Sequence, residues 1–131
     1  MQSSPKYFSE DKQTMDPPIT KRGTAQAHKL AHRLKHIDFN KIYTSDLDRA
    51  IQTAAILKTA VNSEVIVSKL FREINMGEIH KSSCDSFPDV YSRWVLHDED
   101  IPYPNGECGA DVWNRCNQQE HYPALSYTSR I

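Results

Sequence analysis

The sequence has few cysteines, no long apolar run and no excess of either charge. Its three cysteines are an odd number with no C-x-x-C pair, so we expect neither a disulfide framework nor a structural zinc site. The net charge is −1 and no basic stretch is interleaved with aromatic residues, which argues against a nucleic-acid partner. No apolar run approaches membrane-spanning length, and the N-terminus lacks the apolar core of a signal peptide. These absences predict a cytoplasmic protein with no membrane partner.

The 131 residues fit one domain, in which hydrophobic periodicity predicts alternating helices and strands. The polar segment 1–16 has the composition of loop or disorder, and the tail 117–131 shows no period. The order of elements between them predicts an α/β layered fold for residues 17–116. We expect strands over 41–44 and 64–68, and helices from the Thr20 cap to about residue 36, over about 47–61, over 87–97 and around 110–116.

Two apolar patterns predict which side chains are buried. One face of the first helix is apolar and is expected to pack into the core, through Ala27, Leu30, Ala31 and Leu34. The β-branched run Val65–Val67 is typical of a strand that is covered on both faces.

The segment Tyr43–Ala54 carries the clearest functional signal. It follows a short strand, and Ser45 and Asp46 are good N-caps for the helix that begins next. Free backbone N–H groups at such a turn favour an anion, and Arg49 adds a permanently charged fork suited to phosphate oxygens. The segment thus predicts half of a phosphate pocket. On spacing alone, an ordinary strand–loop–helix unit with a surface arginine is the favoured alternative, because short motifs often match by chance.

Four separated segments share their order and spacing with one protein family. They are P-I-T-K-R-G-T-A-Q-A (18–27), Y-T-S-D-L-D-R-A-I-Q-T-A (43–54), L-F-R-E-I-N-M-G-E (70–78) and N-G-E-C-G-A-D-V-W-N-R (105–115). Together they resemble the histidine phosphatase superfamily, also called phosphoglycerate mutase-like, over about residues 17–116. The resemblance implies the family's three-layer α/β/α fold, built on a parallel sheet.

The resemblance also implies a covalent phosphohistidine mechanism. In the family, a histidine in an R-H-G segment attacks a phosphomonoester, two arginines and a second histidine bind the phosphoryl oxygens, and a carboxylic acid protonates the leaving oxygen. By the resemblance, Glu73 is the catalytic acid, whereas Arg49 and Glu107 are assigned to substrate binding. The alternative for Glu73 is a surface carboxylate beside Arg72. The mechanism needs no metal or cofactor, and the implied partner is a small phosphorylated metabolite.

The sequence departs from the family pattern at both ends. It contains no R-H-G segment and no late strand followed by H-G, since His121 lacks both the strand and the glycine. We therefore expect a phosphatase truncated at both ends, with a partial fold, an incomplete parallel sheet, an unpaired strand edge and no activity. Because small sheets are marginally stable, we hypothesise that the chain alone is unstable or molten.

Three functional hypotheses follow. The favoured one is an inactive phosphatase fragment; a mutase remnant fits less well, because residues 76–81 do not continue as the Y-G-x-L-Q-G of phosphoglycerate mutases. The second is a pseudoenzyme that binds phosphate or a phosphoester through Arg49. The third is a metal-binding module built on the i, i+4 stripe of His28, His32 and His36, for which a solvated polar face is the favoured alternative. The sequence indicates neither the substrate nor an oligomeric state.

Overall fold

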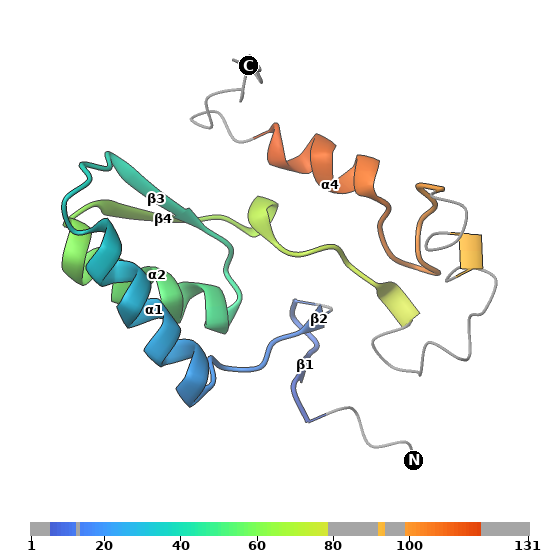
Figure 1. Ribbon diagram of the computed structural model, residues 1–131. Coiled ribbons are helices and arrows are strands. Elements are labelled where there is room, and N and C mark those ends of the chain that lie inside the picture. Colours follow the sequence, from blue (N-terminus) through green and yellow to red (C-terminus); the bar gives the residue numbers. More distant parts are fainter. Residues whose placement is uncertain (1–5, 13, 79–91, 94–98, 119–131) are drawn as a thin grey trace.

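The computed structural model describes residues 6–12, 14–78, 92–93 and 99–118 (Figure 1). The predicted helices and strands between residues 20 and 67 and the short helix near residue 110 are confirmed. The helix predicted over 87–97 lies outside the described residues except at positions 92 and 93, and so does the tail from residue 119. The elements are β1 (Phe8–Ser9), β2 (Thr14–Met15), α1 (Lys21–Leu34), β3 (Lys41–Thr44), α2 (Asp48–Val61), β4 (Glu64–Val67), the 3-10 helix η1 (Lys69–Phe71) and α4 (Gly109–Cys116).

Two parallel strands form the centre of the fold. β3 pairs with β4 so that Thr44 lies opposite Val67, and α2 makes the long crossover that parallel pairing requires. As predicted, Thr20 caps α1, because its hydroxyl oxygen accepts a hydrogen bond of 3.0 Å from the backbone N–H of Gly23. At its other end, α2 stops at Asn62, which adopts the left-handed conformation common at helix C-termini.

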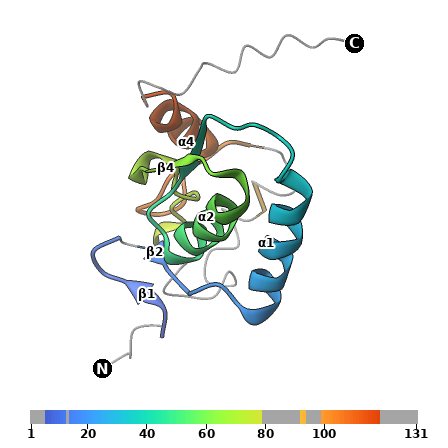
Figure 2. The ribbon, with the colours of Figure 1, turned by 90° about the vertical axis from the view of Figure 1, so that its left-hand side faces the viewer.

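Helices lie on both sides of the parallel sheet. α1 and α2 pack together on one side, and α4 lies on the other side, against η1 (Figures 1 and 2). Tyr43 of β3 points to this second side, where its ring meets that of Phe71 edge to face at 5.7 Å between centroids. This arrangement agrees with the predicted three-layer α/β/α fold. Within the described ranges, no helix has the length and apolar character needed to cross a lipid bilayer.

The hydrophobic core of the described residues is small. Its buried members are Ala27, Ala31, Leu47, Ala54 and Tyr103. The prediction that Leu30 packs in the core is wrong, because its side chain is 43 % exposed. The prediction that β4 is covered on both faces is also wrong, since Val67 is 48 % exposed. The physical reason is the narrow sheet: α1 rests mainly on α2, and two strands give it little surface to cover.

The N-terminal segment differs from the predicted loop. β1 and β2 form an antiparallel pair at residues 8–15. The pair is held by polar contacts to later parts of the chain, since Lys12 Nζ donates to the carbonyl oxygen of Asp46 at 2.8 Å and Arg72 Nη1 donates to that of Lys12 at 3.2 Å. This segment has too few apolar residues to fold alone, and hydrogen bonds to later parts of the chain order it.

Candidate functional site

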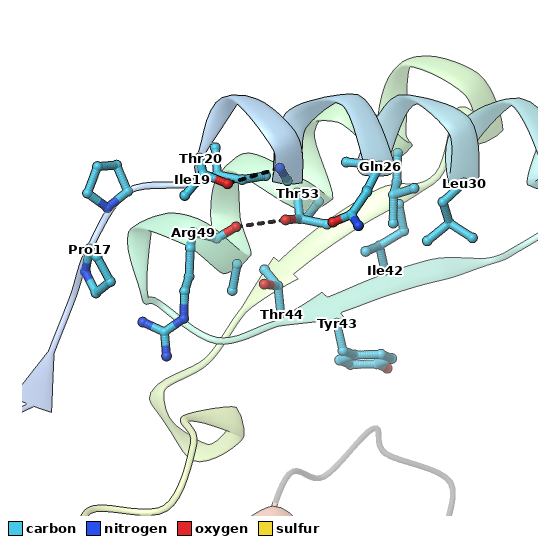
Figure 3. Close-up of a pocket in the computed structure, with 16 residues that line it drawn as sticks. Pro17, Ile19, Thr20, Gln26, Leu30, Ile42, Tyr43, Thr44, Arg49 and Thr53 are labelled. Carbon is cyan, nitrogen blue, oxygen red and sulfur yellow. Dashed lines mark hydrogen bonds between the residues drawn. The ribbon is translucent and has the colours of Figure 1, made fainter.

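Arg49 lies in the first turn of α2, beside the carboxyl end of β3 (Figure 3). Its Nη1 donates one hydrogen bond of 3.3 Å to the carbonyl oxygen of Met15. It forms no ion pair with any residue that the structure describes. Arg49 also lines a groove of about 720 Å³ that is bounded by α1, β3 and α2. The other guanidinium donors of Arg49 have no partner among the described residues, so they are suited to bind an anion.

The N-terminus of α2 is capped differently from the prediction. The N-cap residue is Leu47, so the assignment of Ser45 and Asp46 as caps is wrong. Instead, the backbone N–H of Asp48 donates to Oδ1 of Asp16 at 2.8 Å. The carboxylate of Asp16, which follows β2, therefore supplies one negative charge where free helix N–H groups favour an anion.

Asp46 does not cap α2 but forms an ion pair with Arg72 near the carboxyl ends of the two parallel strands. Both of its oxygens accept hydrogen bonds from Arg72, each at 2.6 Å. The Arg72 guanidinium lowers the pKa of the Asp46 carboxyl, and the carboxylate raises the pKa of Arg72, against the opposing effect of partial burial. Nearby, a hydrogen bond to Asp16 raises the pKa of the Lys12 ammonium. This network holds the N-terminal hairpin against the end of β3.

Glu73, the predicted catalytic acid, lies in the loop after η1 and is exposed. Its Oε1 accepts a hydrogen bond of 3.1 Å from the backbone N–H of Ile74. It lines a cavity of about 190 Å³ next to Arg72, whereas Arg49 lines the larger groove. The structure thus places Glu73 and Arg49 in different cavities, and the catalytic role of Glu73 stays a prediction.

Glu107, the third predicted site residue, is engaged within the fold. Its Oε1 accepts a hydrogen bond from Arg115 Nε at 2.8 Å, and its Oε2 accepts one from the backbone N–H of Asn75 at 2.9 Å. Burial raises the pKa of the Glu107 carboxyl, but the hydrogen bonds from Arg115 and Asn75 outweigh it, so the net shift is downward. Because both oxygens have internal donors, the assignment of Glu107 to substrate binding stays a prediction.

Sequence reasoning missed Arg115 and the pair of Asp46 with Arg72. Arg115 Nη1 and Nη2 donate to the carbonyl oxygens of Leu70 and Arg72, both at 2.6 Å, and so fix the loop that carries Glu73. The Asp46–Arg72 pair had a usable signal, because each residue follows a parallel strand and the carboxyl ends of such strands meet at one sheet edge. Arg115 had none, since the carbonyl groups that it binds are 45 and 43 residues away in the sequence.

The histidine stripe of α1 does not form a metal cluster with other described residues. His28, His32 and His36 are exposed, and within the described ranges no three His, Cys, Asp or Glu side chains gather closely enough to hold a metal ion. His121, the late histidine considered from the sequence, lies outside the described residues.

Comparison with known proteins places the chain in a family. A model of the histidine phosphatase superfamily (branch 1) matches residues 9–121. The match covers most of the sequence, so the chain belongs to this superfamily. The predicted family and its α/β fold are therefore confirmed, and the match extends on both sides of residues 17–116.

Among the curated relatives are bacterial proteins named probable phosphoglycerate mutase GpmB. The one from Enterobacter sp. (strain 638) is 35 % identical over 96 residues, which cover 70 % of this chain and 45 % of the relative. The one from Shigella dysenteriae is 33 % identical over 106 residues, or 78 % of this chain and 49 % of the relative. The chain therefore spans about half the length of these relatives.

The solved structures similar to this chain include two phosphatases. A mycobacterial glucosyl-3-phosphoglycerate phosphatase, in complex with inorganic phosphate, is 27 % identical with a TM-score of 0.67, covering 79 % of this chain and 51 % of that chain. The alpha-ribazole phosphatase from Shigella flexneri is 26 % identical with a TM-score of 0.64, covering 79 % and 53 %. The similar proteins thus include some that are named phosphatases and others that are named phosphoglycerate mutases.

Proposed function

We propose that this chain carries the Arg49 half of a phosphomonoester phosphatase site and binds a small phosphorylated metabolite or inorganic phosphate there. The position of Arg49 carries the proposal: it lies at the carboxyl end of β3, its one hydrogen bond goes to a backbone carbonyl, and no described residue forms an ion pair with it. By contrast, carboxylates hold Arg72 and Arg115. Of the three arginines, Arg49 keeps donors available for a phosphoryl group.

We expect the chain to bind phosphate without turnover. The phosphohistidine mechanism needs a nucleophilic histidine, and the sequence contains neither R-H-G nor H-G. Glu73 keeps its role as the acid by resemblance alone. An inert fragment is the second candidate, and the carboxylate of Asp16 at the N-terminus of α2 favours it, because this negative charge competes with a phosphate.

A phosphatase ancestry is proposed over a mutase ancestry. The third matched segment lacks the Y-G-x-L-Q-G continuation of phosphoglycerate mutases, and two structurally similar proteins bear the names of phosphatases. The mutase names of the curated relatives support the alternative, a phosphoglycerate mutase-type remnant. The few cysteines favour the reducing cytoplasm as the compartment.

Calorimetric titration of inorganic phosphate against the wild-type chain and Arg49→Ala tests the proposal. We expect the substitution to weaken binding about 10- to 100-fold, because a hydrogen bond to a charged group contributes about 1.5–3 kcal/mol. Arg33→Ala is the matched control, since it removes an exposed arginine of α1 away from this site and leaves phosphate affinity unchanged.

The outcomes separate the hypotheses. If the wild-type chain gives no heat of phosphate binding, the hypothesis of an inert fragment is the one that remains. An assay with a generic phosphomonoester is expected to give no turnover. Turnover that persists through purification and disappears in Arg49→Ala would contradict the argument from the missing nucleophile.

A further inference from the structure

Helix α1 belongs to a stretch of the chain that carries positive charge and no negative charge. The stretch from Lys21 to Ile37 holds five lysines or arginines and three histidines, but no aspartate or glutamate. The rest of the chain holds 11 lysines or arginines against 17 acidic residues. With histidine counted as neutral, the formal net charge is therefore +5 for the stretch and −6 for the rest of the chain. A chain that is nearly neutral as a whole is thus strongly polarised.

The helix gathers these basic side chains on the side of α1 that faces away from α2. Ala27 and Ala31 are buried where α1 packs against α2. Because the helix repeats every 3.6 residues, the basic residues fall on the other side, and all of them are exposed. We call this set the basic face; its members are Lys21, Arg22, His28, Lys29, His32, Arg33, Lys35 and His36. Figure 2 shows α1 at the outer side of the described part of the chain.

The charges of the basic face are not used inside the described fold. No member of the face forms an ion pair with any residue that the structure describes, whereas Asp46 holds Arg72 and Glu107 holds Arg115. Lysine and arginine side chains are almost never fully buried unless they are paired, because taking a charge out of water costs much free energy. The composition of the face therefore favours a solvated anionic partner over burial beneath an apolar part of a protein.

Exposed apolar side chains adjoin the basic face at its C-terminal end. Ile37 is 50 % exposed and Phe39 is 40 % exposed. Together with Leu30 they are three of the seven large hydrophobic side chains that are exposed among the described residues, and all three lie within residues 30–39. Positive charge beside exposed apolar side chains is typical of a helix that lies on a membrane surface. A nucleic acid would engage the charges alone, since α1 has no aromatic side chain on which a base could stack.

We propose that the basic face, with Ile37 and Phe39 at its end, binds the surface of a membrane that contains anionic phospholipids. The lysine and arginine side chains contact the anionic headgroups, and the two apolar side chains enter the interface beside them. The net negative charge of the rest of the chain is repelled by the same surface, so the chain binds in one orientation. The lack of a membrane-spanning run led us to expect no membrane partner, but binding at the surface needs no such run.

Co-sedimentation of the full chain with lipid vesicles tests the proposal. The probe is a vesicle of phosphatidylcholine with about 30 % phosphatidylserine, and the reference is a vesicle of phosphatidylcholine alone. At about 0.1 M salt we expect at least tenfold tighter binding to the anionic vesicle, and at about 0.5 M salt we expect most of this preference to disappear, because salt screens the charges. Equal binding to the two vesicles, or no binding to either, would overturn the proposal.

Two double variants with the same net charge test whether the basic face is the surface that binds. Lys29→Glu with Arg33→Glu reverses two charges of the face, whereas Lys58→Glu with Lys69→Glu reverses two exposed lysines outside it. Each lysine or arginine near an anionic membrane strengthens binding about fivefold, so we expect the first variant to lose at least tenfold in affinity and the second less than about threefold. Equal losses in the two variants would contradict the assignment to this face.

A pair of single variants tests the apolar contact. Ile37→Ser and Ile51→Ser make the same change at two exposed isoleucines, of which only Ile37 adjoins the basic face. We expect about a fivefold loss of vesicle affinity in Ile37→Ser and none in Ile51→Ser. Equal effects of the two, or full displacement of the chain by single-stranded RNA at an equal phosphate concentration, would overturn the membrane as the partner. Vesicle binding and the phosphate titration with Arg49→Ala are separate measurements, so either proposal can fail alone.

Discussion

At the scale of single residues, the arginines near the carboxyl ends of β3 and β4 divide into two kinds. Arg115 is 15 % exposed and joins the Glu107 carboxylate to backbone carbonyls of the segment that contains η1. Arg72 joins β3 to the N-terminal hairpin. Among the described residues, the Arg49 side chain donates its one hydrogen bond to the Met15 carbonyl. The first two arginines are structural, which leaves Arg49 as the candidate for binding.

Arg115→Ala is expected to lower the free energy of unfolding by about 2–3 kcal/mol, because it removes the ion-pair partner of the partly buried Glu107 carboxylate and the guanidinium donors to the carbonyl oxygens of Leu70 and Arg72. Urea unfolding followed by circular dichroism measures the change. Arg93→Ala is the control, since the Arg93–Glu99 pair is 54 % and 42 % exposed and such pairs contribute about 0–1 kcal/mol. Equal losses in the two variants would show that Arg115 is not a structural anchor.

At the scale of elements, loops 75–78 and 103–107 cross closely. The backbone N–H of Glu78 donates to the carbonyl oxygen of Pro104 at 3.0 Å. Gly77 has φ +55°, and a Cβ added there would lie 2.1 Å from this same oxygen. Both the left-handed backbone and the contact require glycine, so the crossing fixes the path of the chain beyond Glu73.

Gly77→Ala should therefore lower the free energy of unfolding by about 2 kcal/mol or more, through backbone strain and displacement of the opposing loop. Gly23→Ala in α1 is the comparison. Its Cβ would lie 2.9 Å from Cγ1 of Ile19, a side chain rather than backbone, so we expect Gly23→Ala to cost less than Gly77→Ala. Denaturant unfolding of both variants checks the difference. A Gly77→Ala chain as stable as Gly23→Ala would argue against the tight crossing.

At the scale of the whole molecule, acid should destabilise the fold through Asp46 and Glu107. Their folded-state pKa values lie below the ordinary values of 3.8 and 4.5. The unfolded chain therefore binds protons first as the pH falls. The stabilisation is complete above the ordinary values and is lost as the pH falls through the folded-state values.

We expect the contribution of Asp46 and Glu107 to the free energy of unfolding to be constant down to about pH 5 and to decline below about pH 4. Urea unfolding across this range measures it. In Asp46→Asn, which removes one titrating group, stability should be lower at neutral pH and should fall less steeply in acid. If the stability of Asp46→Asn falls with acid as steeply as that of the wild type, Asp46 does not contribute to the loss of stability at low pH.

In the part of the chain that the structure describes, the core is small and the parallel sheet has two strands, which supports the hypothesis that the isolated chain is unstable or molten. We expect a broad thermal transition and weak near-UV circular dichroism, because few side chains are fixed by packing. A sharp, reversible transition with a strong near-UV signal would contradict this expectation. Sedimentation at several concentrations tests whether an exposed strand edge leads to association.

Local sequence patterns were sufficient for most elements and for the position of Arg49. Periodicity placed α1, β3 and α2, and the Thr20 cap lay where a side-chain oxygen could reach the first turn. The same patterns failed for the N-cap of α2. Of its two local candidates, Ser45 is buried and Asp46 forms an ion pair with Arg72.

The sequence by itself therefore determined the family, the order of helices and strands, and an arginine at the end of β3, because these depend on neighbouring residues and on matched segments. Tertiary structure alone decided which charges are engaged. The hydrogen bonds of Asp16 to Asp48, of Arg72 to Asp46 and of Arg115 to Leu70 span 32, 26 and 45 residues, so no pattern of neighbouring residues marks them. It also decided that Leu30 faces an open groove, because the exposure of a helix face depends on the width of the sheet beneath it.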